Sequence, residues 1–132
     1  MISKVEKIKS FDDRRGSLLP FEFNNLDFES KRIFIVNQVP TGEIRGNHSH
    51  YKTKQYIICI SGSVNVMLDN GSDKETHHLS KNEAILVPEL IWDSQEFLTD
   101  DTAILVICST EFDLDDYIFN YTVFIKAIDN VK

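Results

Sequence analysis

Residues 42–62 of the chain read GEIRGNHSHYKTKQYIICISG, and this stretch decides how the rest of the sequence is interpreted. His48 and His50 are two residues apart, so on a β-strand both imidazoles project from the same face. The apolar run 56–60 is rich in β-branched and aromatic residues and stops at Ser61-Gly62, which predicts a buried strand. The stretch therefore predicts two histidines held side by side on a β scaffold.

The segments around this stretch also predict strands. Residues 63–69 alternate polar and apolar and close on Asn70-Gly71, a strong hairpin signal. Residues 11–17 are expected to form a polar turn. Their apolar content predicts further strands at residues 2–8, 32–37 (buried on both faces), 83–88 and 103–108. Strands of this length with turn signals about every ten residues predict a sandwich or barrel.

The C-terminal segment has a helical periodicity instead. Apolar and aromatic residues recur at helical spacing at Tyr117, Ile118, Tyr121, Phe124, Ile125 and Ile128. The acidic residues Asp113, Asp115 and Asp116 precede this run, which suits the start of a helix. We therefore expect a short helical tail, packed on the β-structure or on a partner subunit. The sequence has no internal repeat or linker, so residues 1–132 are expected to form one domain.

Composition and charge exclude several classes of partner. The chain carries a formal charge of −7, which disfavours nucleic acid and anionic membrane surfaces. No apolar run approaches the length of a transmembrane helix, and the N-terminus does not resemble a signal peptide. Cys59 and Cys108 both lie in apolar strand-like runs, which predicts buried free thiols in a reducing cytoplasm.

The spacing of these residues resembles the two motifs of the cupin superfamily. Gly42, His48, His50, Gln55 and Gly62 keep every spacing of the first motif, with Gln55 where metal-binding members carry Glu. In the second motif Pro88 keeps the register, while Leu90 replaces a glycine and Asp93 replaces a histidine. The resemblance implies an all-β cupin double-stranded β-helix (jelly roll) with a short C-terminal helical segment.

The chain more closely resembles the cupin-fold nucleotide-sugar 3,4-ketoisomerases, which act on dTDP-4-keto-6-deoxyglucose. The resemblance covers nearly the whole chain, and one departure is Trp92-Asp93 where the family pattern has Trp-His. The matching pieces are residues 15–18, 31–32 and 45–52, then Gln55, residues 68–71, Pro88, Trp92, residues 116–118, Tyr121 and Phe124.

This resemblance implies a reaction and a setting. The keto group of a dTDP-linked keto sugar moves from C4 to C3 through an enediol intermediate by histidine acid/base catalysis. This reaction needs no redox cofactor, and we expect no metal because Gln55 and Asp93 replace two of the ligands of metal-binding cupins. The resemblance implies a homodimer in the cytoplasm, working in the biosynthesis of deoxyamino sugars for a surface polysaccharide such as the lipopolysaccharide O-antigen.

The resemblance also suggests roles for individual residues. His50 is expected to be the base, and His48 to orient it or to shuttle the second proton. Arg15 and Arg45 are expected to pair with the diphosphate of the substrate. The aromatic residues Phe34, Tyr51 and Trp92 are expected to stack on thymine or to line the sugar pocket. The other expected substrate-binding residues are Lys52, Gln55 and Asp93. Lys52 is expected on the face of the histidines if their strand continues. His77 and His78 are interpreted as surface residues.

The residues themselves leave three alternatives open. His48, His50 and Asp93 match a two-histidine, one-carboxylate metal site with Gln55 as a weak fourth ligand, as in a metal-dependent cupin. A non-catalytic sugar-binding cupin needs the same fold but not both histidines. A related nucleotide-sugar isomerase or epimerase differs mainly in where the proton is returned, and Asp93 can reshape its sugar pocket.

Overall fold

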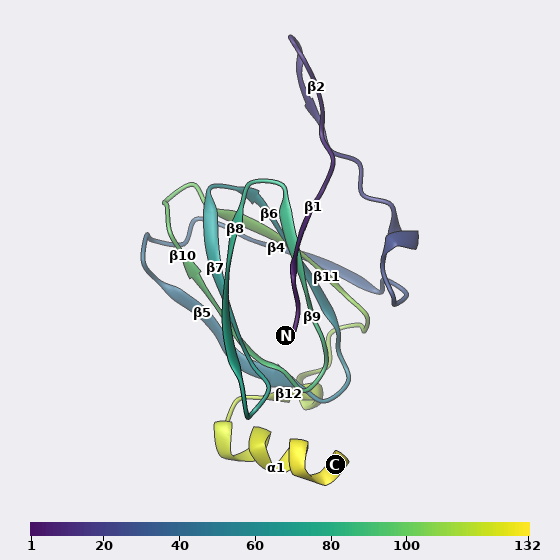
Figure 1. Cartoon of the computed structure of the whole chain (residues 1–132), viewed down its shortest axis with the longest axis vertical. Coiled ribbons are helices and arrows are strands. Elements are labelled where there is room, and N and C mark those ends of the chain that lie inside the picture. Colours follow the sequence, from purple (N-terminus) through teal and green to yellow (C-terminus); the bar gives the residue numbers. More distant parts are fainter.

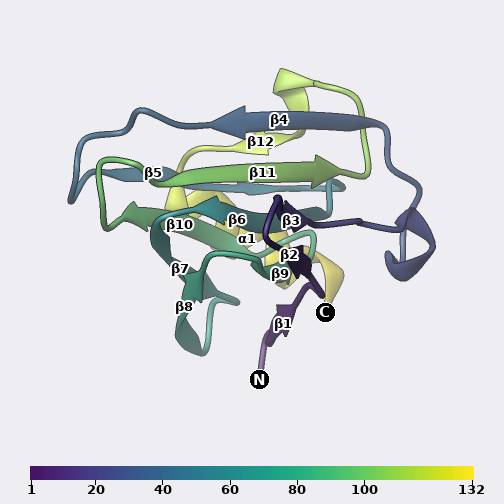
Figure 2. The ribbon, with the colours of Figure 1, turned by 90° about the horizontal axis from the view of Figure 1, so that it is seen from above.

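Two five-stranded antiparallel sheets face each other in the computed structural model, which describes residues 1–132 (Figures 1 and 2). The first sheet has the order β1 (Val5–Lys7), β9 (Glu83–Val87), β6 (Gln55–Ser61), β11 (Ala103–Cys108) and β4 (Arg32–Val36). The second has the order β12 (Tyr117–Ile118), β5 (Ile44–His50), β10 (Trp92–Phe97), β7 (Ser63–Asp69) and β8 (Lys74–Ser80). This β-sandwich confirms the predicted all-β jelly roll.

The core fills the space between the two sheets. In β7 the alternation predicted from the sequence is observed, because Val64, Val66 and Leu68 point inward and are almost fully buried. Each such side chain contributes about 1.5–3 kcal/mol through burial. The other members of the cluster are Val39, Ile57, Cys59, Leu79, Ile85, Val87, Ile91, Phe97, Ile104, Val106 and Cys108. Both cysteines are buried free thiols, as predicted.

The hairpin predicted at Asn70-Gly71 is present between β7 and β8. The side chain of Asn70 accepts hydrogen bonds from the backbone N–H groups of Ser72 and Asp73, which closes the turn. Gly71 has a φ of +92°, and a Cβ atom there would lie 2.9 Å from Ile128. The turn therefore requires glycine for its backbone angle, while the added Cβ atom would meet only the flexible end of the Ile128 side chain.

The structure corrects two predictions in the first third of the chain. Residues 32–37 do not form a strand buried on both faces. Strand β4 lies at a sheet edge, so Phe34 faces inward while Ile33 and Ile35 are 49% and 55% exposed. The predicted turn at 11–17 is a hairpin of β2 (Phe11–Asp13) and β3 (Gly16–Leu18), which extends away from the sandwich (Figure 1).

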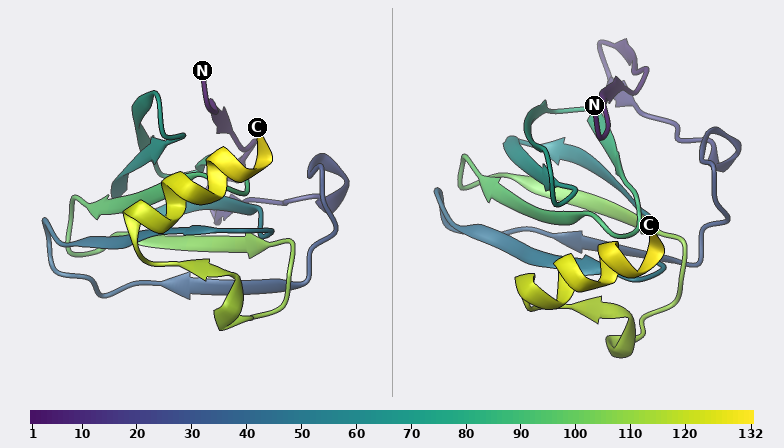
Figure 3. Two further views of the ribbon diagram at one scale, coloured as in Figure 1. Left: turned by 90° about the horizontal axis from the view of Figure 1, so that it is seen from below. Right: turned by 60° about the horizontal axis from the view of Figure 1, so that its bottom comes forward.

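The C-terminal segment contains the predicted helix, but the helix starts later than expected. Helix α1 (Tyr121–Val131) is capped by Asn120, whose side chain accepts a hydrogen bond from the N–H of Val123. The acidic run is not its start, because Asp113 caps the separate 3₁₀ turn Leu114–Asp116. Helix α1 lies across one end of the sandwich (Figure 3), and no helix is long and apolar enough to cross a membrane.

Candidate active site

The inner faces of both sheets line a small cavity at the centre of the sandwich. Strands β4, β5, β6 and β10 contribute its polar and aromatic side chains. These are Phe34, Arg45, His48, Gln55 and Gln95, with Val36, Ile57, Ile104 and Val106 as the apolar wall. Four of the residues predicted from the sequence, Phe34, Arg45, His48 and Gln55, are therefore brought together from three different strands.

A β-bulge in β5 explains how Arg45 reaches the cavity. Asp93 pairs with His48 and Ser94 pairs with Gly46, so Asn47 is an extra residue in β5 with no partner in β10. In a regular strand Arg45 and His48, three residues apart, would project from opposite faces. The extra residue restores both to the inner face. Asn47 has a φ of +58°, which asparagine tolerates better than most residues.

Gly46 fits this bulge for two reasons. Its φ is +92°, which favours glycine. A Cβ atom at this position would also lie 3.1 Å from the carbonyl oxygen of Asp93 and 3.1 Å from the Cα atom of Ser94. Gly46 therefore allows β5 to pack against β10 at the point where Asp93 and His48 meet.

His50 is positioned as a neutral imidazole beside its neighbour. The rings of His48 and His50 are 5.0 Å apart, on the same face as predicted, and the ring of Tyr117 lies 4.4 Å from that of His50. His50 is 5% exposed. Burial, followed by the charge of His48, lowers the pKa of His50 to about 4. At neutral pH this imidazole is therefore uncharged and able to accept a proton.

His48 is in the opposite electrostatic situation. Its Nδ1 atom lies 3.7 Å from Oδ1 of Asp93, and neither atom has any hydrogen-bond partner in the chain. The other oxygen of Asp93 accepts a hydrogen bond from the side-chain amide of Gln95. Burial opposes the charged form of His48, but the interaction with Asp93 outweighs it and raises the pKa of His48. The site thus holds one neutral and one readily charged histidine.

Four of the residues suggested for substrate binding do not line this cavity. Trp92 is on the outer face of β10, where its ring is 5.3 Å from that of Tyr121. Strand β5 ends at His50, so Tyr51 and Lys52 do not continue the face of the histidines. The backbone of Lys52 donates instead to the carboxylate of Asp116. Arg15 lies in the β2–β3 hairpin and pairs with Asp13 at 2.7 Å.

The structure also brings in residues that the sequence reasoning missed. Aromatic rings beside the histidines form a rim made of Phe112, Tyr117 and Phe119, in which Tyr117 and Phe119 stack at 5.4 Å. The guanidinium of Arg32 packs over Phe34 at 4.8 Å and over Phe112 at 5.1 Å. Tyr117 was assigned to the helical run, but it pairs with His50 in β12. Its place in the matching end pattern of the ketoisomerases was the available signal.

The residues do not fit a metal centre. The chain contains no group of three or more histidine, cysteine, aspartate or glutamate side chains placed to hold a metal ion. Gln55 replaces the charged ligand of metal-binding cupins, and its amide donates to the sulfur of Cys108 at 3.7 Å. The metal-dependent alternative based on His48, His50 and Asp93 therefore lacks a convergent ligand set in this structure.

Comparisons with known proteins agree with this geometry. The family model described as "FdtA: WxcM-like, C-terminal" matches residues 1–129. The chain is 33% identical over 134 residues to TDP-4-oxo-6-deoxy-α-D-glucose-3,4-oxoisomerase of Aneurinibacillus thermoaerophilus, covering 100% of this chain and 96% of that protein.

Two solved enzymes superpose closely on the structure. The sugar 3,4-ketoisomerase QdtA of Thermoanaerobacterium thermosaccharolyticum, in complex with TDP, is 29% identical with a TM-score of 0.90, covering 98% of this chain and 96% of that one. A variant of QdtA with one histidine replaced by asparagine was solved with TDP-4-keto-6-deoxyglucose. A 3,4-ketoisomerase of Helicobacter canadensis is 25% identical with a TM-score of 0.90, covering 98% of each chain.

Proposed function

The chain belongs to the FdtA (WxcM-like, C-terminal) family, and on this premise we propose that it is a sugar 3,4-ketoisomerase acting on dTDP-4-keto-6-deoxyglucose. The enzyme is an isomerase that moves the keto group of the hexose from C4 to C3. The observation that carries the proposal is the pair His48 and His50, which share one face and have pKa values shifted in opposite directions. A proton transfer between neighbouring carbons needs one acceptor and one donor, and this pair supplies both.

The first step is removal of the proton on C3, which the adjacent C4 carbonyl makes acidic. His50 is the base, because its low pKa keeps it unprotonated at neutral pH. Loss of the proton gives an enediolate whose negative charge develops on the C4 oxygen. The side chains of Gln55 and Arg45 line the cavity together with His48 and carry N–H donors suited to that oxygen.

The second step returns a proton to C4, and His48 is the donor. Asp93 favours the imidazolium form of His48, so a proton is available at neutral pH. When His48 protonates C4, the proton of the C3 hydroxyl moves to the C4 oxygen, which leaves a carbonyl at C3 and a hydroxyl at C4. The proton that His50 took from C3 then replaces the one that His48 gave up. No electrons are gained or lost overall, so the reaction needs no redox cofactor.

The nucleotide is bound at the rim of the site. Phe112, Tyr117 and Phe119 offer aromatic faces on which a thymine base can stack. Arg45, which lines the cavity, and Arg32, which packs on the rim ring of Phe112, can each pair with the diphosphate. Arg32 is held in place by the rings of Phe34 and Phe112, so less side-chain entropy is lost on binding.

The enzyme works as a homodimer in this proposal. Ile33 and Ile35 expose an apolar strip at the edge of the first sheet, and Phe11 and Leu18 are 52% and 66% exposed on the protruding hairpin. Both surfaces are apolar enough to favour association with a second copy. Arg15 lies on the same hairpin. In the dimer we expect Arg15 to serve the diphosphate site of the other subunit.

The setting follows from the chemistry. The product is a 3-keto sugar, the substrate that an amino-group transfer to C3 requires, which supports a role in the formation of deoxyamino sugars, and we propose a surface polysaccharide as their destination. Two buried free thiols suit a reducing compartment such as the cytoplasm.

The test is direct. The purified protein is incubated with dTDP-4-keto-6-deoxyglucose labelled with ¹³C at C3 and C4, and the carbonyl resonance is followed by NMR. We expect the carbonyl signal to move from C4 to C3. A carbonyl that stays at C4 while the configuration at a neighbouring carbon inverts would identify an epimerase instead.

A further inference from the structure

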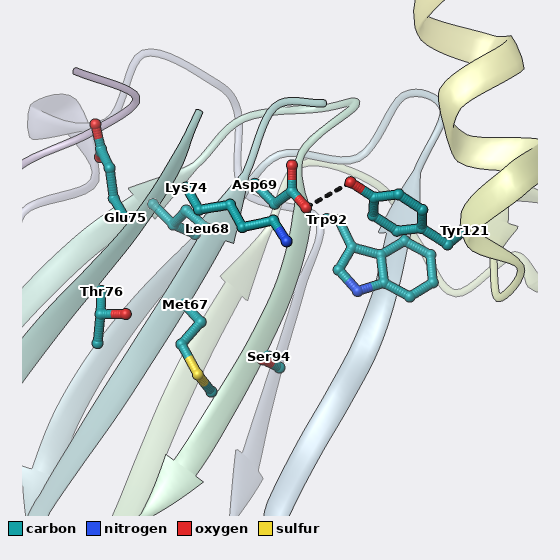
Figure 4. Close-up of a pocket in the computed structure, with 9 residues that line it drawn as sticks. All are labelled: Met67, Leu68, Asp69, Lys74, Glu75, Thr76, Trp92, Ser94 and Tyr121. Carbon is teal, nitrogen blue, oxygen red and sulfur yellow. Dashed lines mark hydrogen bonds between the residues drawn. The ribbon is translucent and has the colours of Figure 1, made fainter. Parts of the chain in front are cut away.

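A second cleft of about 520 Å³ lies on the outer face of the sheet, between strands β7, β8 and β10 and the start of helix α1 (Figure 4). It is on the opposite side of β10 from the histidines. Trp92 and Ser94 line the cleft, whereas Asp93 and Gln95 face inward toward His48. The cleft is therefore separate from the proposed active site, and the isomerase reaction does not use it.

The walls of the cleft are fixed by contacts that do not involve a ligand. The indole ring of Trp92 packs against Tyr121 at 5.3 Å and Phe124 at 5.7 Å. The hydroxyl of Tyr121 donates to Oδ2 of Asp69 at 2.7 Å, and the N–H of Gly71 donates to Oδ1 at 2.7 Å. An aromatic edge and a carboxylate are thus already held beside each other, as the dashed line in Figure 4 shows.

Around this fixed core, several hydrogen-bonding groups have no partner in the chain. The ammonium group of Lys74 forms no ion pair. The hydroxyls of Thr76 and Ser94 and the indole N–H of Trp92 form no intramolecular hydrogen bond. The carboxylate of Asp69 accepts two bonds and keeps further lone pairs. The cleft therefore offers donors and acceptors together, beside the apolar surface of Met67 and Trp92.

The charges in the cleft indicate the class of ligand. Lys74 is the one cation on the outer face of these strands and Asp69 is the carboxylate on that face, because Glu75 pairs with the core residue Leu68 on the other side of the sheet. Hydrogen bonds from His77 and from the backbone of Ile2 lower the pKa of Glu75 to about 2, so this carboxylate is ionised. Because the Glu75 carboxylate is engaged by Ile2 and His77, the cleft holds one free cation and one carboxylate, and their opposite charges disfavour a ligand with a net charge. The unpartnered donors and acceptors disfavour a purely apolar ligand.

We propose that this cleft binds an uncharged pyranose sugar. A pyranose presents C–H groups that pack on an aromatic ring, and hydroxyls that donate to a carboxylate and accept from an amine or a hydroxyl. The residues of the cleft match both requirements. The sugar ring itself is the recognised group, whether it occurs free or at the end of a glycan.

The test is a titration with methyl α-D-glucopyranoside, which carries no nucleotide. Trp92 is the only tryptophan in the chain, so its fluorescence reports on the cleft. We expect a saturable fluorescence change, with ¹⁵N amide shifts at Met67, Thr76 and Ser94. Lys74→Met and Thr76→Val should each weaken binding about fivefold, the scale of one lost hydrogen bond. Isomerase activity should stay unchanged in both variants.

Two controls separate this site from the active site. Lys81→Met removes an exposed lysine that does not line the cleft and should bind the glycoside like wild type. His50→Asn should also leave glycoside binding unchanged, even though it abolishes isomerisation. Absence of saturable binding, amide shifts confined to the surroundings of His48, or shifts seen only with a dTDP-linked sugar would each overturn the proposal.

Discussion

The carboxylate of Asp93 lies 3.7 Å from Nδ1 of His48 across two neighbouring strands, and both atoms are buried without another partner. Asp93 follows Trp92 where the family pattern has Trp-His, so in this chain the position after Trp92 carries a carboxylate instead of an imidazole. The structure shows what the substitution does. Asp93 raises the pKa of His48 while Gln95 holds the other oxygen of the carboxylate.

Replacing Asp93 by Asn should change the pH dependence of catalysis. Without the carboxylate the pKa of His48 falls, because burial then acts alone against the charged form. The alkaline limb of the kcat/KM profile should move to lower pH, so that activity falls more at pH 8 than at pH 6. Glu96→Gln is the matched control, since Glu96 lies on the same strand and bonds to Asn65. Superimposable profiles for Asp93→Asn and wild type would contradict this role.

The low pKa of His50 should make the fold sensitive to acid. In the unfolded chain the imidazole of this residue is protonated below about pH 6.5, whereas in the folded protein it stays neutral down to about pH 4. Stability should therefore fall as pH drops between these values, by up to about 3 kcal/mol. Urea denaturation of wild type and His50→Asn at several pH values measures the difference. The variant should lose clearly less stability, and parallel curves would refute the assignment.

Gly46→Ala should disturb the site through its contact with β10. The close approach to Asp93 and Ser94 and the positive φ both oppose a Cβ atom, so we expect a loss of stability of about 1–3 kcal/mol and a large fall in turnover. Gly42→Ala is a sharp control, because Gly42 has a similar φ of +89° but nothing within 4 Å of the added atom. It should lose stability and keep its activity. Equal turnover in the two variants would show that the contact with β10 is not needed.

The contributions of Arg45 and Arg15 to dTDP binding should be measurable one at a time. Arg45→Ala removes a charge-assisted contact and should weaken binding by about 1.5–3 kcal/mol, measured by calorimetry. Arg15→Ala should have a comparable effect, provided that the hairpin reaches a second subunit. Arg14→Ala, next to it on the same exposed hairpin, is the control and should bind normally. A monomeric sedimentation coefficient at micromolar concentration, or normal affinity in Arg15→Ala, would remove the dimer part of the proposal.

The sequence predicted the strands whose side chains alternate or are continuously apolar. Strand β10 was missed because Asp93, Ser94 and Gln95 are polar although buried, and hydrophobic periodicity cannot detect such a strand. Tyr117 was misassigned because its spacing to Tyr121 fits a helix, while the cap at Asn120 separates the two. Local spacing alone could not distinguish these arrangements.

The sequence predicted which residues belong to the candidate site better than it predicted the directions of their side chains. The spacing of two residues placed His48 and His50 on one face, and the structure agrees. Arg45 was selected by the motif, but its direction depends on the bulge at Asn47, which appears only when β5 pairs with β10. Trp92 was expected near the substrate, but side chains alternate along β10, so Trp92 points to the outer face of the sheet while Asp93 points to the inner face. The pairing of β10 was the missing information in each case.

The most direct test of the central claim measures exchange of the C3 hydrogen in D₂O and product formation together, in His50→Asn, His48→Asn and the surface control His78→Asn. If His50 is the base, its loss should slow both processes by about 10²–10⁴-fold. His48→Asn should retain exchange at C3 while product formation stops, and His78→Asn should match wild type. Undiminished C3 exchange and full turnover in His50→Asn would contradict the proposed mechanism.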